Sequence, residues 1–250
     1  MPANNPFGKT DKGRKRTNNE DSFFLAAPFG MFDAFMIVAD GMGGHSYGEV
    51  ASSLAISTVA EYIQQAPINM PGYLLEQAVL RANDAVFRKS ADMNTFGMGT
   101  TLVIAAVVGR DVYIANIGDS RAYYVDPKKY TIKQITKDHS YVEEMVEKGM
   151  MKRGSEEYER SKNVITRAVG TMPKVEPDLF EQRMRRGSYL LLCSDGLSGM
   201  VRDIMIKNLI LDETFPMERK VESLIHTANE QGGKDNITAV LYKAEEDADA

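Results

Sequence analysis

Short apolar runs that meet an Asp-Gly pair are the feature that most constrains this 250-residue chain. The run FMIV is followed by Ala, Asp40 and Gly41, and YLLLC is followed by Ser, Asp195 and Gly196. In GGKDNITAVLY, Asp235 stands just ahead of a third apolar run. Such runs predict buried strands with a carboxylate at one end. Three of these carboxylates can build an oxygen-rich site for hard divalent cations, which suggests metal-activated water attacking a phosphoryl group.

Composition excludes several classes of protein. The hydrophobic fraction of 43% and the charged fraction of 26% are typical of a globular protein of one large domain or two small ones. A net charge of -5 lacks the basic footprint of a nucleic-acid binder. The apolar runs are too short to span a bilayer, so we expect no membrane partner.

Cysteine content and the first residues indicate the compartment. The single Cys193 excludes an intramolecular disulfide framework and a cysteine-rich metal site. The opening MPANNPFGKTDKGRKRTNNED has no apolar core after its charges, unlike a secretory signal. We therefore expect a cytoplasmic protein.

Periodicity predicts alternating groups of strands and helices. Between residues 100 and 136 it predicts several antiparallel strands, with turns at 109–111 and 126–127. Residues 138–163 are charged and helical in character, as in a peripheral insertion. The other expected elements are strands near 22–27, 34–39, 179–182, 188–193 and 236–242, and helices near 48–64, 73–89, 202–211 and 217–231. Without strict strand–helix–strand alternation, this order predicts an α+β fold.

Eight sequence blocks in order point to one family. The blocks are RTNNEDS (16–22), VADGMGGH (38–45), GTT (99–101), NIGDSRAY (116–123), ITKDHS (135–140), NVITRAVGT (163–171), LLLCSDGLSGMV (190–201) and GGKDNITAVL (232–241). This series resembles the metal-dependent protein serine/threonine phosphatases of the type 2C class, in their small bacterial single-domain form. The resemblance runs from about residue 8 to residue 242.

The resemblance implies a fold and a domain plan. The expected fold is a four-layer α-β-β-α sandwich, in which two antiparallel sheets pack face to face with helix pairs outside and the site lies at one end. One catalytic domain would cover residues 1–242, with a flap-like insertion at about 138–163. The acidic tail 243–250 is expected to be disordered.

The resemblance also implies two Mn²⁺ or Mg²⁺ ions. Asp40 corresponds to the carboxylate that bridges them, the Gly41 carbonyl to a ligand of one, and Asp195 and Asp235 to the remaining carboxylates. An all-oxygen donor set suits these ions, and clustered carboxylates repel one another unless cations neutralise them.

Further site residues follow from matched positions. Glu20 and Asp21 match an acidic pair that holds metal-bound waters, and Asn236 matches a position that supports the site through hydrogen bonds. Arg16 matches the arginine that grips the substrate phosphate, for which a guanidinium fork is suited. Asp119 matches the ligand of a third, weaker metal ion, but an Asp-Ser turn or cap is an equally good interpretation.

These roles imply direct hydrolysis of phosphoserine and phosphothreonine in proteins. A water bridging the two ions attacks phosphorus in line, Arg16 and the ions stabilise the equatorial oxygens, and no phosphoenzyme forms. The implied partners are phosphoproteins, among them a cognate bacterial-type serine/threonine kinase. We expect a monomer.

The chain departs from the family pattern at two places. Many eukaryotic relatives carry a His where this chain has Met42, whose thioether cannot donate a proton to the leaving oxygen. The general acid is therefore unassigned among the side chains, which leaves a metal-bound water. In the flap (141–162), residues 160–162 read Arg-Ser-Lys where bacterial relatives commonly have a His-Pro pair.

Other reactive residues are interpreted as structural. His45 and His139 fit structural roles better than catalytic ones. A cysteine phosphatase places an arginine six positions after its nucleophile, whereas Gly199 stands there relative to Cys193. In an apolar strand, Cys193 is interpreted as a small buried hydrophobic residue.

Two alternatives remain open at this stage. The chain could be an inactive phosphoprotein-binding protein of the same fold, although it retains Asp40, Asp195 and Asp235. It could also be another two-metal hydrolase such as a nuclease, against which its acidic charge argues.

Overall fold

The computed structural model describes residues 5–43, 47–66, 70–91 and 97–245, and contains two antiparallel sheets. The first sheet has the strand order β1-β11-β10-β7-β8. Its strands are β1 (Phe7–Asp11), β11 (Ile237–Lys243), β10 (Tyr189–Cys193), β7 (Arg121–Asp126) and β8 (Thr131–Gln134).

The second sheet has the order β2-β3-β5-β6-β9, and the short β4 pairs with the end of β3. Its strands are β2 (Asp21–Ala26), β3 (Ala34–Met42), β5 (Leu102–Val108), β6 (Asp111–Ile117), β9 (Asp178–Arg183) and β4 (Gly99–Thr100).

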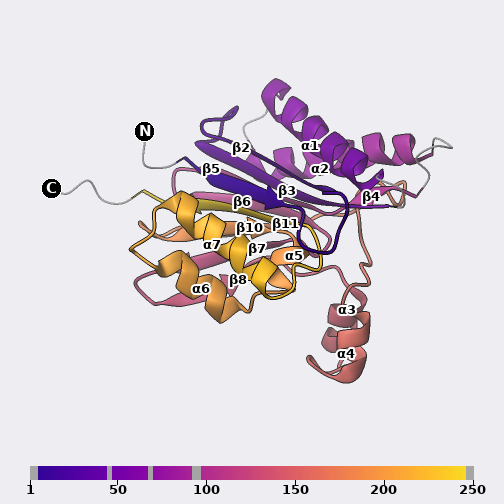
Figure 1. The fold of residues 1–250 in the computed structure, drawn as a ribbon. Helices are drawn as coiled ribbons and strands as arrows, with labels where there is room; N and C mark the ends of the chain where they lie inside the picture. Colours follow the sequence, from indigo (N-terminus) through magenta and orange to yellow (C-terminus); the bar gives the residue numbers. More distant parts are fainter. Residues whose placement is uncertain (1–4, 44–46, 67–69, 92–96, 246–250) are drawn as a thin grey trace.

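Helix pairs cover the outer faces of the two sheets (Figure 1). One pair, α1 (Tyr47–Gln65) and α2 (Pro71–Ser90), packs on the β2–β9 sheet. The other, α6 (Asp203–Leu211) and α7 (Met217–Glu230), packs on the β1–β8 sheet. The predicted four-layer α-β-β-α sandwich is confirmed.

Residues alternate between two cores along the central strands. In β3, Phe35 and Ile37 pack into the core beneath α1 and α2, while Met36 and Val38 pack between the sheets. All four are fully buried. Because strands in the middle of four layers bury both faces, they appear in the sequence as continuous apolar runs.

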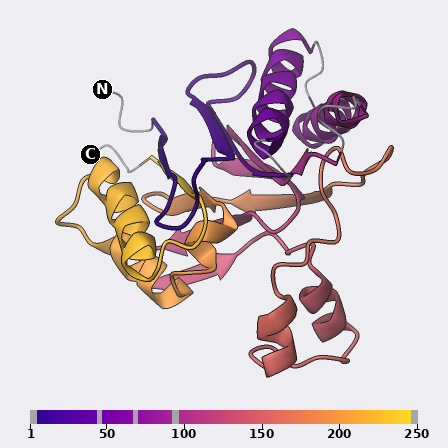
Figure 2. The ribbon, with the colours of Figure 1, turned by 45° about the vertical axis from the view of Figure 1, so that its right-hand side comes forward.

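The insertion predicted at 138–163 forms two short helices, α3 (Tyr141–Glu147) and α4 (Glu156–Ser161), which project from the sandwich (Figure 2). Ser140 and Ser155 accept hydrogen bonds from the first turns of these helices. Each helix therefore begins at a serine N-cap.

The structure also contains elements that the periodicity did not predict: β1, β4 and the one-turn helix α5 (Asp195–Ser198). All three border the site, and β4 and α5 are too short to give a periodic signal. The sequence predicted Asp40 at the end of its strand, which is wrong. Strand β3 continues two residues past Asp40, so this aspartate lies inside the strand.

At the C-terminal end, β11 continues to Lys243, one residue beyond the predicted domain boundary. Residues 246–250 of the predicted disordered tail lie outside the described residues, as does His45. No helix in the described ranges is long and apolar enough to cross a membrane.

Candidate active site

Strand pairing brings the predicted carboxylates to one end of the sandwich. Asp21 and Asp40 are directly opposite each other in the β2–β3 ladder. Asp195 begins α5 immediately after β10, and Asp235 stands just before β11, the neighbour of β10. The two sheets therefore each supply two of these four acids.

Two hydroxyl groups from the opposite sheet hold Asp21. Ser194 Oγ and Thr238 Oγ1 each donate a hydrogen bond of 2.7 Å to Asp21 Oδ2. The other carboxylate oxygen, Oδ1, is buried without a partner among the described residues. Sequence reasoning missed Ser194 and Thr238, although each lies within three residues of a predicted metal-ligating aspartate.

The GTT block supports the backbone at Asp40. The Asp40 amide donates to Thr101 Oγ1 at 2.9 Å, and the Asp40 carbonyl accepts from Thr100 Oγ1 at 2.9 Å and from the Thr101 amide at 2.8 Å. These bonds hold the strand in place where it passes through the acidic cluster.

Gly41 occupies a position that excludes a side chain. A Cβ atom there would lie 2.0 Å from the Gly48 carbonyl oxygen and 2.6 Å from that of Glu20. The Gly41 amide donates to the same Glu20 carbonyl at 3.1 Å. Backbone atoms at the start of α1 and at Glu20 therefore require a glycine at this position.

Asp235 forms an ion pair with Arg16. Arg16 Nη2 lies 2.7 Å from Asp235 Oδ2, and the arginine side chain is half exposed. Asn236 does not bond the other predicted acids through its side chain: it accepts from the Glu20 amide and donates to the carbonyls of Lys12 and Asn18. Its side chain therefore links the backbone of Glu20 to that of Lys12 and Asn18.

Asp119 lies between β6 and β7 and is 7% exposed. Its Oδ1 atom is buried without a partner among the described residues. Nearby, Arg121 forms a forked pair with Asp138, with N–O distances of 2.7 to 3.1 Å, and donates to Tyr123 Oη. Sequence reasoning assigned no role to this buried pair.

Burial and mutual repulsion perturb the acids. Desolvation is the main cause that raises the pKa of Asp21, Asp40, Asp119 and Asp195, and charges on the other aspartates add to it. The hydrogen bonds that Thr238 and Ser194 donate to Asp21 oppose this rise in its pKa. A cluster of this kind is stabilised either by protons or by bound cations.

The donor set fits hard divalent cations. Buried, unpartnered oxygens on Asp21, Asp119 and Asp195 are available as ligands. In the described residues, no group of three or more His, Cys, Asp or Glu side chains could hold a metal ion by side chains alone. A metal site here therefore needs water and backbone oxygen as well, a coordination that Mg²⁺ tolerates well.

His139 and Cys193 have structural surroundings. His139 is buried, its Nδ1 accepts from the Gly118 amide at 3.1 Å, and its Nε2 lies 3.2 Å from Asp178 Oδ2. Cys193 is fully buried, which raises the pKa of its thiol to about 12. A thiol with so high a pKa is a poor nucleophile.

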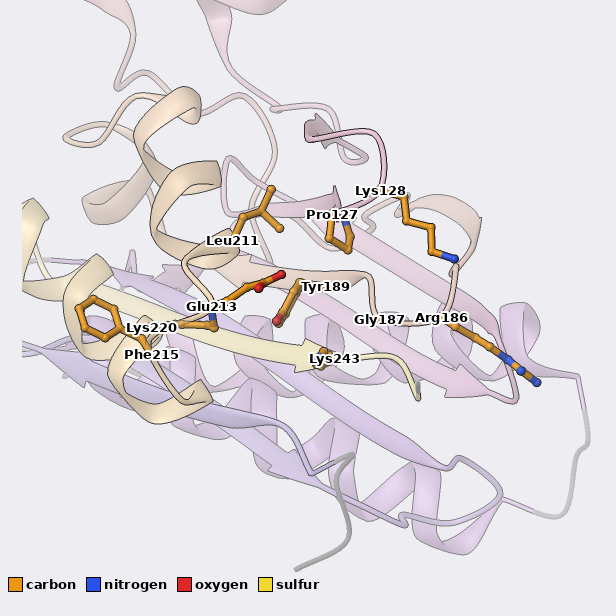
Figure 3. Close-up of a pocket in the computed structure, with 10 residues that line it drawn as sticks. All are labelled: Pro127, Lys128, Arg186, Gly187, Tyr189, Leu211, Glu213, Phe215, Lys220 and Lys243. Atoms are coloured by element: carbon orange, nitrogen blue, oxygen red, sulfur yellow. The ribbon is translucent and has the colours of Figure 1, made fainter. Parts of the chain in front are cut away.

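Two cavities differ in their relation to the acids. One of about 190 Å³ lies between the flap and the cluster, with Asp119 and Asp195 in one wall and Tyr158 and Lys162 in the other. A larger one, of about 550 Å³, is lined by the residues that Figure 3 draws, among them Tyr189 at the start of β10. Since Asp195 follows the end of β10, the larger cavity lies at the opposite end of the sheet and is not the candidate site.

Comparison with known proteins agrees with this geometry. Residues 10–242 match the family model described as protein phosphatase 2C. The chain belongs to the protein phosphatase 2C family, as the sequence blocks predicted.

Relatives and solved structures match over nearly the whole chain. The serine/threonine phosphatase stp of Listeria monocytogenes is 35% identical, with 94% of each chain covered. The S. agalactiae serine/threonine phosphatase superposes with a TM-score of 0.90 at 30% identity, covering 97% of this chain and 100% of that one. The catalytic domain of the phosphatase PstP, solved in complex with 2 manganese ions, has a TM-score of 0.83 at 34% identity. The match covers 97% of this chain and 99% of that one.

Proposed function

We propose that this protein is a metal-dependent protein serine/threonine phosphatase that hydrolyses phosphoserine and phosphothreonine directly. The observation that carries the proposal is the meeting of four mutually repelling acids at one end of the sandwich: Asp21 and Asp119, which are buried, and Asp40 and Asp195, which are partly buried. Family membership and the names of the relatives support the same reaction class.

The site is proposed to hold two Mn²⁺ or Mg²⁺ ions, as the PstP complex with two manganese ions suggests. Asp40 would bridge them, the Gly41 carbonyl would bind one, and Asp195 and Asp235 would complete the protein ligands. When bound, the ions supply an activated bridging water and positive charge beside the phosphoryl oxygens.

Other residues orient water, phosphate and backbone. Glu20 and Asp21 accept hydrogen bonds from water in the site, and the hydroxyl groups of Ser194 and Thr238 fix the orientation of Asp21. Arg16, at the exposed side, turns its fork from Asp235 to the equatorial oxygens of the phosphate. Asp119, whose Oδ1 atom is buried without a partner among the described residues, would hold a third, weaker ion.

Proton delivery to the leaving oxygen needs no side chain in this scheme. Met42, the last residue of β3, has no acidic proton, and the Cys193 thiol is buried. The seryl or threonyl oxygen therefore takes its proton from water in the site.

We also propose the substrates, the cellular location and the oligomeric state of the protein. Substrates are phosphoproteins, among them a cognate bacterial-type serine/threonine kinase. The protein acts in the cytoplasm as a monomer, with one catalytic domain over residues 1–242 and the flap at about 138–163. The alternative of an inactive phosphoprotein-binding protein is not favoured, because all the predicted acidic ligands are present.

Phosphate release from a phosphothreonine peptide, with Mn²⁺ and with chelator, tests the function. Wild type is expected to release phosphate only with metal, and Asp235→Asn to lose most of this activity because one ligand charge is gone. Absence of release with Mn²⁺, Mg²⁺ or other divalent ions, from protein shown to be folded by circular dichroism, would reject the enzyme.

A further inference from the structure

We propose that a basic loop beside the active site selects phosphoproteins with acidic residues next to the phosphorylated one. The basic loop consists of Lys12, Arg14 and Lys15, between β1 and β2, together with Lys234 from the segment before β11. This inference rests on the proposed function and specifies its substrate class.

Backbone hydrogen bonds fix the basic loop at the catalytic end. The amides of Arg14 and Lys15 donate to the Gly233 carbonyl at 2.7 and 3.2 Å. Asn236 Nδ2 donates to the Lys12 carbonyl at 2.9 Å and to the Asn18 carbonyl at 2.8 Å. In Figure 1 the indigo loop between β1 and β2 lies beside α5, which carries Asp195. Main-chain atoms and one amide side chain thus hold the loop without using its cationic groups.

The four cationic side chains of the basic loop are exposed. Within the described part of the chain, none of them forms an ion pair with a carboxylate, in contrast to Arg16, which pairs with Asp235. A hydrogen bond from Asn229 is the main cause that lowers the pKa of the Asp11 carboxyl; the Gly13 amide and the charge of Arg14 add to it, but Arg14 forms no ion pair with Asp11. The charges of the loop are therefore available to a ligand.

Nearby acids do not cancel this positive charge in the active enzyme. Glu49 accepts a hydrogen bond from Asn18, and Asp235 is paired with Arg16. Asp235 and Glu20 are assigned to the metal ions and their waters, so their charge is offset when the ions are bound. The chain as a whole carries -5, which makes the basic loop a local exception to an acidic protein. Local charge of this kind favours acidic ligands and disfavours basic ones.

A peptide whose phosphate is bound at Arg16 would place its neighbouring residues beside the basic loop. Arg16 is proposed to grip the phosphate, and Lys15 and Arg14 precede it directly in the chain. An extended peptide advances about 3.3 Å per residue. Asp or Glu side chains within roughly three residues of the phosphothreonine would therefore meet the ammonium and guanidinium groups.

Steady-state kinetics with two phosphothreonine peptides tests the proposal. One peptide carries Asp and Glu on both sides of the phosphothreonine, and the other carries Ala there. Arg14→Ala/Lys15→Ala is compared with Lys128→Ala/Lys129→Ala. The second variant removes two exposed cations from the turn after β7, at the end of this strand away from Asp119. The control matches the change in net charge, and thermal melts establish that both variants are folded.

The expected result is a loss of about three- to tenfold in kcat/KM for the acidic peptide in Arg14→Ala/Lys15→Ala, mainly through KM. The Ala peptide and para-nitrophenyl phosphate should change by less than about twofold. The control should leave the preference for the acidic peptide unchanged. Equal losses in both variants, or an unchanged ratio between the two peptides, would overturn the proposal.

A binding measurement separates this proposal from the proposed function. Fluorescence anisotropy in Mn²⁺ follows an acidic peptide carrying the non-hydrolysable phosphonate analogue of phosphothreonine. Weaker binding in Arg14→Ala/Lys15→Ala alone supports the basic loop even if no phosphate is released. Full turnover with equal binding by all three proteins supports the phosphatase and rejects the loop.

Discussion

Arg16 Nη2 lies 2.7 Å from Asp235 Oδ2, which joins the proposed phosphate-binding residue to a proposed metal ligand. Hydrogen bonding to Asp235 raises the pKa of the guanidinium, and Asp40 and Glu20 add to the shift. Because the Arg16 side chain is half exposed, the pair adds little to stability. In the proposed mechanism, a metal ion would compete with Arg16 for Asp235, and the substrate phosphate would compete with Asp235 for Arg16.

This relationship predicts opposite effects on catalysis and on metal binding. Arg16→Lys is expected to lower kcat/KM by about 10- to 100-fold, since a point charge replaces a bidentate fork. Binding of Mn²⁺, measured by calorimetry without substrate, should be equal or tighter, since Asp235 loses a competing partner. A marked fall in Mn²⁺ affinity would show that Arg16 organises the metal site instead.

Asp119→Asn tests the third ion. If Asp119 binds only a third, weaker ion, the variant should keep two tightly bound Mn²⁺ ions and lose a weaker class of site. Its activity should fall at low Mn²⁺ and recover partly at high Mn²⁺. Metal content after gel filtration, together with titration calorimetry, measures both classes. Loss of a tightly bound ion would place Asp119 among the main ligands.

The acidic cluster predicts that metal-free protein loses stability as pH rises. Folding raises the pKa of Asp195 from 3.8 to about 6, of Asp21 to about 7 and of Asp119 to about 8. The folded state then binds protons more tightly than the unfolded state, so this contribution is complete below pH 3.8 and is progressively lost as the pH rises through about 6 to 8.

Calorimetry in chelator at about pH 5.5 and pH 8 should show a Tm lower by several degrees at the higher pH. Groups whose pKa is lowered in the folded state, such as Asp178 and Glu143, change the stability only below about pH 5. They therefore do not affect the comparison between about pH 5.5 and pH 8. Adding Mn²⁺ should raise Tm more at pH 8, because deprotonated ligands bind it. A metal-free Tm that increases between these pH values would contradict the interpretation.

Removing either hydroxyl group that donates a hydrogen bond to Asp21 should destabilise the folded protein. Ser194→Ala and Thr238→Val each delete a hydrogen bond to a buried carboxylate, and each should lower the free energy of unfolding by about 1–3 kcal/mol. Each should also raise the Mn²⁺ concentration needed for half-maximal activity. Ser57→Ala, which removes an exposed hydroxyl bond within α1, should change stability by less than about 0.5 kcal/mol. Urea denaturation measures all three.

Gly41→Ala should be among the most damaging single-methyl changes. Its Cβ would overlap backbone atoms at 2.0 and 2.6 Å, so either β3 or the start of α1 must move. We expect a loss of about 3 kcal/mol or more, with lost metal binding. Gly72→Ala in α2 meets no atom within 4 Å and should stabilise the helix by about 0.5–1 kcal/mol. Equal stability of the two variants would show that the contact at Gly41 relaxes.

The elements with a clear period were predictable, and the shortest were not. The runs around β3, β10 and β11 are apolar throughout because each strand lies between a sheet and a helix layer. Strand β4, with two residues, and helix α5, with four, leave no periodic trace. The continuation of β3 past Asp40 depends on pairing with β4, a contact between distant segments.

From the sequence by itself came the acids, the glycine at position 41, the arginine and the family, because the residue types and their order carry that chemistry. Only the tertiary structure decided how the acids are held. Ser194 and Thr238 reach Asp21 across separations of 173 and 217 residues. The physical reason is that hydrophobic periodicity is a local property of the chain, whereas the neighbours of a buried carboxylate are set by the register and packing of two sheets.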